Sequence, residues 1–69
     1  MDFQIRQAVQ MNVQNDSASS FHETIDDAIK QGDEHLLPGL GVFLEAWWQR
    51  SDEAAHEQFT NVLAEHFKQ

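Results

Sequence analysis

The sequence has no cysteine, only one proline and three glycines, and few basic residues among its 69 positions. Without cysteine there is no disulfide and no thiolate metal site, so a reducing compartment is compatible with the chain. No apolar run approaches the ~20 residues of a membrane span, and the first residues lack the basic stretch and apolar core of a signal peptide. We therefore expect a soluble protein that stays where it is made, with no membrane partner.

Acidic residues dominate the charge. Twelve Asp and Glu residues oppose four Lys and Arg residues, and the formal net charge is −8. This excess argues against general binding to the phosphate backbone of nucleic acids. In strong acid the carboxylates become neutral while the basic side chains and the four histidines are cationic, so the side-chain charge changes to about +8. A small chain with so high a charge is expected to stay dissolved in acid.

The length predicts a single domain over residues 1–69. A folded chain of this size buries only about 60% of the surface that its unfolded form exposes, so its stability should be marginal. Because neither a disulfide nor a thiolate metal site can stabilise it, additional stability would have to come from self-association or from a partner.

Helical periodicity predicts an all-α fold, a small bundle of about four short helices. Ser20 and Glu23 match a capping box at the start of the second helix, and Gly32 is its expected stop. Ser51 is the expected N-cap of the fourth helix. The four helices are expected near residues 3–13, 20–31, 38–50 and 52–68.

The third helix is expected at the centre of the protein. Its segment holds the only proline, Pro38, which fits the first position of a helix because it lacks an N–H group and has a fixed φ. Large apolar residues then recur with the spacing of a buried stripe. We expect Leu44 of this helix and Phe59 of the fourth to be buried. The stripe consists of Leu40, Phe43, Leu44, Trp47 and Trp48.

Both tryptophans belong to this helix. Trp47 and Trp48 lie about 100° apart around it, so one of them is expected to be exposed. Together with Phe43 they can either fill a small core or form an interface, and the sequence favours neither use. A homodimer through Phe43, Trp47 or Trp48 is one prediction. It should strengthen with salt, because screening reduces the repulsion between two acidic copies.

No constellation of residues indicates an enzyme. Glu53 and His56 form a single Glu-x-x-His spacing, whereas carboxylate-bridged di-metal bundles need a second such motif and further glutamates. Because no such second motif is found, the four histidines His22, His35, His56 and His66 are expected to be surface residues or partial core fillers. We therefore expect no catalytic residue, no metal and no cofactor.

Three stretches between residues 5 and 49 carry a family resemblance. The first begins at Ile5-Arg6 and the second at Thr24-Ile25. The third and most specific is Leu37-Pro38-Gly39-Leu40-Gly41-Val42, followed by Glu45 and Trp48. Together they resemble the small acid-soluble spore protein I family of endospore-forming bacteria. The resemblance implies a non-enzymatic protein of the dormant spore core, made in the forespore cytoplasm during sporulation. It implies no catalytic residues, and it leaves the partner, a spore protein or a second copy, unidentified.

An alternative function is a nucleic-acid-binding module. Pro38-Gly39-Leu40-Gly41 resembles the hairpin of helix-hairpin-helix modules, in which small residues let backbone N–H groups approach a phosphate. However, the next basic residue is Arg50, so the expected electrostatic support is missing. The competing interpretation is that Gly41 permits close packing of helices, while Asp33 or Glu34 caps the helix start.

We expect no saturable binding of the chain to duplex DNA at about 0.1 M salt, because its charge repels the phosphates. Fluorescence anisotropy of a labelled duplex measures this directly. A saturable, salt-sensitive isotherm that Gly41→Glu abolishes would establish the nucleic-acid-binding alternative instead.

Overall fold

A computed structural model describes residues 4–69 and shows four α-helices. Phe3, at the start of the first expected helix, lies outside the described residues. No strand occurs from residue 4 onward, and the predicted small all-α fold is confirmed. The elements are α1 (Ile5–Val13), α2 (Ala18–Gln31), a 3₁₀ turn η1 (Glu34–Leu36), α3 (Leu37–Arg50) and α4 (Glu53–His66).

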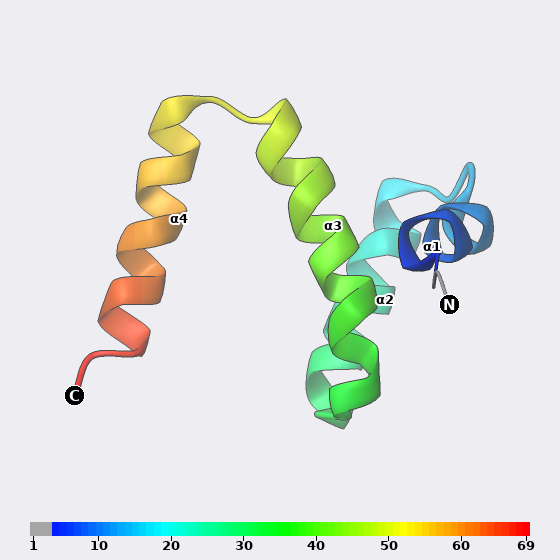
Figure 1. The fold of residues 1–69 in the computed structure, drawn as a ribbon, viewed down its shortest axis with the longest axis horizontal. Coiled ribbons are helices and arrows are strands. Elements are labelled where there is room, and N and C mark those ends of the chain that lie inside the picture. The colour runs from blue at the N-terminus through cyan, green and yellow to red at the C-terminus, as the bar shows by residue number, and fades with distance from the viewer. Residues whose placement is uncertain (1–3) are drawn as a thin grey trace.

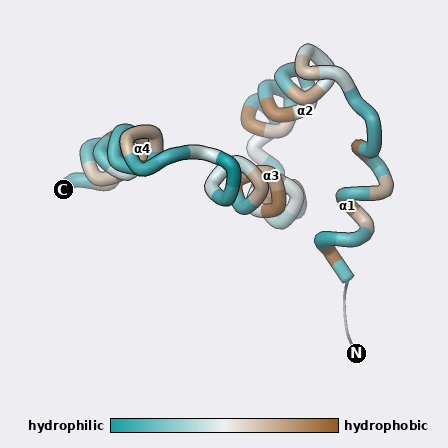
Figure 2. Tube along the Cα trace, turned by 90° about the horizontal axis from the view of Figure 1, so that it is seen from above, coloured by the Kyte–Doolittle hydropathy of each residue, from teal (hydrophilic) through white to brown (hydrophobic). Residues whose placement is uncertain are grey.

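The helix α3 lies at the centre of the arrangement. Figure 1 shows α4 beside it as the second leg of an inverted V, joined to α3 only at the top. In the view from above, α1 and α2 lie on one side of α3 and α4 lies on the other (Figure 2). The chain therefore consists of a three-helix cluster from which α4 extends.

The start of α2 differs from the expected capping box. The helix begins at Ala18, and Ser17 is its N-cap, with a hydroxyl oxygen that accepts a hydrogen bond from the Ser20 N–H at 3.1 Å. Ser20 is therefore inside the helix, and the pairing expected with Glu23 does not define its end. Ser17 can take the extended backbone of a cap, with ψ 165°, because it precedes rather than continues the helix.

The start of α4 is also shifted by one residue. Asp52 is the N-cap, and its carboxylate accepts a hydrogen bond from the Ala55 N–H at 2.9 Å. Ser51, the expected cap, instead donates its hydroxyl back to the Trp47 carbonyl oxygen at 2.7 Å. The ionised carboxylate of Asp52 is favoured at the positive, N-terminal end of the α4 dipole. The Ser51 hydroxyl can also donate a hydrogen bond, so it can pair with a carbonyl at the end of α3.

Of two other helix signals, the stop at Gly32 is where the sequence placed it, whereas Asp33 caps η1 and no side-chain hydrogen bond caps the start of α3. Gly32 ends α2 in the left-handed conformation, with φ +64°, which a residue without Cβ adopts at little cost. Asp33 caps η1 by accepting the His35 N–H at 2.9 Å, and this backbone hydrogen bond lowers the pKa of Asp33. Since η1 leads directly into α3, the helix begins at Leu37 and Pro38 occupies its first turn.

The apolar layer lies where α1 and α2 meet α3. Its centre is an edge-to-face contact between Phe21 and Phe43, with ring centroids 5.5 Å apart and planes at 79°. None of the described side chains is fully buried, so this layer is thin. Its half-buried apolar members include Ile5, Val9, Val13, Phe21, Ile25, Leu40, Val42 and Phe43.

Two expectations about packing are wrong. Leu44 is not a core residue, because 42% of it is exposed on the side of α3 that faces away from the apolar layer. Gly41 does not allow close helix packing within the chain, because a Cβ built there would meet no atom within 4 Å. Phe59 is half-buried, with its ring centroid 5.4 Å from that of Trp47.

The unequal burial predicts an order of stabilities. Phe43→Ala should lower the free energy of unfolding by about 2–3 kcal/mol, because it removes a ring from the layer between helices. In the single chain Leu44→Ala should cost at most about 1 kcal/mol, because much of that side chain is already in water, so the two variants are compared at concentrations at which the chain is monomeric. Urea unfolding followed by far-UV circular dichroism measures both. Equal costs at the two positions would contradict this assignment of the core.

Candidate interaction surface

Apolar residues occur on every side of α3. One side, with Leu40 and Phe43, contacts the layer formed with α1 and α2. A second side, with Pro38 and Val42, faces α1. The third side is open and, by helical register, carries Leu37, Gly41, Leu44 and Trp48. A helix that is apolar all round is typically buried all round, but this one is covered on two sides only.

An ion pair joins α1 to the side of α3 that faces it. The Arg6 guanidinium donates two hydrogen bonds to the Glu45 carboxylate, from Nε to Oε1 and from Nη2 to Oε2, each 2.7 Å long. This two-point geometry fixes the direction as well as the distance between the two helices. Arg6 and Glu45 are 39 positions apart in the sequence, and both belong to the stretches that carry the family resemblance.

The same pair changes the titration of both groups. The side-chain hydrogen bond from Arg6 lowers the pKa of Glu45, and the pKa of Arg6 is raised, chiefly by the same hydrogen bond. Each group is thus held in its charged form. The pair neutralises the only charged side chain on α3 before Arg50.

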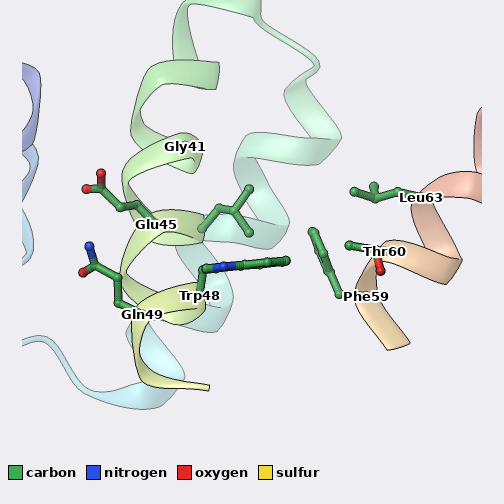
Figure 3. A pocket seen from close by; sticks show the side chains of 8 residues that line it. Gly41, Glu45, Trp48, Gln49, Phe59, Thr60 and Leu63 are labelled. Atoms are coloured by element: carbon green, nitrogen blue, oxygen red, sulfur yellow. The ribbon is translucent and has the colours of Figure 1, made fainter. Parts of the chain in front are cut away.

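An apolar groove separates α3 from α4. It has a volume of about 490 Å³, and Trp48 on α3 faces Phe59 and Leu63 on α4 across it (Figure 3). The side chain of Glu45 points away from α4 in this view. The groove is lined by Gly41, Leu44, Glu45, Trp48, Gln49, Phe59, Thr60 and Leu63.

The closed end of the groove is an aromatic cluster beside the connection between the two helices. The His56 ring stacks on Trp48, with centroids 3.8 Å apart and planes within 5°. His56 Nε2 lies 2.8 Å from the Trp48 carbonyl oxygen, and since a carbonyl only accepts, this ring nitrogen is the donor. His56 and Ser51 thereby satisfy two carbonyls at the C-terminal end of α3, which fixes α4 there.

The Glu-x-x-His spacing has a structural use at this end. His56 Nδ1 lies 3.6 Å from Glu53 Oε1, and Nε2 is engaged by the Trp48 carbonyl. Within residues 4–69 no three His, Asp or Glu side chains are grouped so that they could bind a metal ion. Over the same range, every helix is too short or too polar to cross a lipid bilayer.

The structure divides the residues of the predicted dimer face. Phe43 contacts Phe21 inside the three-helix cluster, whereas Trp48 lines the open groove. Trp47 packs on Phe59 near the closed end. The two tryptophans are equally exposed, at 41% and 39%, so the expectation that one of them alone would be exposed is wrong.

The motif residues are likewise shared between two surfaces. Pro38 and Val42 face α1, Trp48 borders the groove, and Gly41 and Glu45 line both surfaces. Sequence reasoning placed Leu63 only on the apolar stripe of α4 and did not bring it to this site. The pairing of Arg6 with Glu45 had no local signal at all.

The lowered pKa of Glu45 predicts how stability changes with pH. A carboxyl group whose pKa is lower in the folded state stabilises the fold above its unfolded pKa, and this contribution is lost as the pH falls through the folded value. Wild type should therefore melt at a higher temperature than Glu45→Gln at pH 7. The difference should decrease as the pH falls below 4.5, the ordinary glutamate pKa, and disappear once Glu45 is protonated in the folded chain.

Thermal melts at a series of pH values measure this difference. Glu57→Gln is the matched control, because it removes the same charge from α4, where no ion pair of Glu57 occurs among residues 4–69. A difference between wild type and Glu45→Gln that persists at pH 2 would contradict the role assigned to the ion pair.

Comparison with known proteins extends the resemblance to the whole chain. The family model described as "Small, acid-soluble spore protein I" matches residues 3–67, which include α4. Proteins of that name from Geobacillus kaustophilus strain HTA426 and Bacillus cereus strain ATCC 14579 are 39% and 41% identical to it. These alignments cover 100% and 99% of both chains, respectively. The homologue from Halalkalibacterium halodurans is 37% identical over 94% of this chain and 96% of its own.

No solved structure matches the chain. The family assignment therefore rests on sequence, and the contacts described above show how the family's sequence pattern is used in three dimensions. The match over residues 3–67 and the full-length relatives establish that this chain belongs to the small, acid-soluble spore protein I family.

Proposed function

We propose that the chain is a non-enzymatic protein of the spore core, made in the forespore, that acts through contacts with proteins, including copies of itself. Membership of the spore protein family supports the setting. The observation that carries the mode of action is the open side of α3. Leu44 and Trp48 there border a groove in which the one charged side chain, Glu45, is already paired with Arg6.

This surface has the character of a protein interface. Aromatic residues are enriched at the centre of interfaces, and charged residues are depleted there. Trp48 supplies an aromatic ring on one wall of the groove, and Phe59 and Leu63 supply the opposite wall (Figure 3). A nucleic acid would instead require a surface with free basic side chains.

The basic residues do not provide such a surface. Arg6 pairs with Glu45, and Lys30 pairs with Asp26 at 3.2 Å within α2. Arg50 ends α3 and Lys68 follows α4, so these two basic residues lie at opposite ends of α4 and form no common patch. The start of α3, where the helix-hairpin-helix alternative would hold a phosphate, has no basic residue in its first turn. The geometry therefore favours protein contacts over the nucleic-acid-binding alternative.

The location can be tested by fractionation of a sporulating host that carries the chain with a C-terminal epitope tag. We expect the tagged chain to be absent from growing cells and to appear in the acid extract of broken, decoated spores. Its high positive charge in acid should keep it dissolved. A tagged housekeeping enzyme is the control for release from growing cells. Recovery of the chain from growing cells, or only from the spore coat, would overturn the proposed location.

A further inference from the structure

We propose that the groove between α3 and α4 is occupied by α4 of a second copy of this chain, so that two α3–α4 pairs form a symmetric four-helix assembly. This inference rests on the proposed function and deepens it, because it names the occupant of the apolar surface. The groove's walls are Leu44 and Trp48 on α3 and Phe59 and Leu63 on α4.

The chain exposes more area than a compact protein of its mass, enough to supply the interface of a stable dimer. A folded monomer of 8.0 kDa is expected to expose about 4,500 Å², from the scaling of surface with mass, whereas this chain exposes 6290 Å². The excess is roughly 1,800 Å² per copy. If both copies buried it, the interface would total about 3,600 Å², which lies in the range of obligate homodimers.

The helix α4 carries the apolar residues that would fill such a groove. Val62, Leu63 and Phe67 are exposed to 62%, 40% and 73%, although they continue the stripe that begins at Ala55 and Phe59. Since α4 diverges from α3 towards its C-terminal end, nothing among residues 4–69 covers the lower part of this stripe (Figure 1).

We favour a second copy as the occupant because α3 and α4 form the groove, and α4 is also the apolar helix that would fill the groove of the partner. A two-fold interface requires this kind of self-complementary surface, in which each copy gives and receives the same element. Four helices packed around Leu44, Trp48, Phe59 and Leu63 would bury the open side of α3. Gly41, where a Cβ would have free space in the single chain, would let the partner helix approach closely.

The charge distribution permits this association. Between Leu37 and Gln69 there are five acidic and two basic residues, so this half of the chain carries −3 of the total −8. Glu45 is the only charged residue of the groove, and its partner Arg6 lies on the opposite side. The repulsion between copies therefore comes mainly from distant surfaces, and salt should weaken it.

Sedimentation equilibrium of the purified chain tests the proposal at several concentrations, in low and high salt. We expect a dimer that strengthens with salt. Leu63→Glu should raise its dissociation constant at least about tenfold, because it would place a charge in the apolar interface. Asn61→Glu is the matched control. It adds the same charge to α4, but residue 61 lies outside the groove lining, so its dissociation constant should stay close to that of wild type.

Gly41→Leu is a second, independent variant. A Cβ at residue 41 meets no atom within 4 Å in the single chain, and leucine has a higher helix propensity than glycine, so the variant should fold. The leucine would extend into the groove and weaken the dimer. Far-UV circular dichroism checks that each variant is helical. If Leu63→Glu does not fold, Gly41→Leu decides the test alone.

A monomer mass up to hundreds of micromolar in high salt would overturn the proposal. A dimer that Leu63→Glu and Gly41→Leu leave intact, or that Asn61→Glu weakens equally, would also overturn the assignment to this groove. These measurements use the purified chain and do not depend on where it resides in the cell. The fractionation experiment can therefore contradict the proposed location while sedimentation still shows the dimer. Equally, sedimentation can exclude the dimer while fractionation supports the location.

Discussion

The structure depends on one constraint, which is that α3 is apolar on all sides while the other helices cover only two of them. Two sides are covered by α1 and α2, with the contact between Phe21 and Phe43 at the centre. The third side stays open because α4 leaves α3 at an angle (Figure 1). The open side of α3 is thus a result of how α3 and α4 are joined, since the two helices meet only at one end.

The ion pair of Arg6 and Glu45 makes this arrangement compatible with a strongly acidic chain. It places the one carboxylate on the middle of α3 against α1, and it leaves the groove between α3 and α4 without an unpaired charge. A surface ion pair by itself contributes little stability, but a two-point contact fixes orientation. The pair therefore matters for two reasons: it orients α1 against α3, and it keeps the side of α3 that faces the groove free of unpaired charge.

The sequence was informative where a signal is local. Periodicity located all four helices, and Gly32 located the end of α2, because both depend on neighbouring residues. The N-caps were shifted because Ser17 and Asp52 compete with nearby residues that can accept the same hydrogen bonds. Leu44 was misplaced for another reason, since periodicity shows which residues share a face but not whether anything covers that face. The partnership of Arg6 and Glu45 joins distant helices, and only the fold reveals it.

The thin apolar layer also determines how the isolated chain should respond to heat and denaturant. The heat capacity change and the denaturant sensitivity of unfolding both grow with the surface that unfolding exposes. Because no side chain from residue 4 onward is fully buried, unfolding of a single copy exposes less apolar surface than unfolding of a compact protein of the same mass. Its stability curve should therefore be flatter than that of such a protein, and its thermal transition should extend over a wider temperature interval.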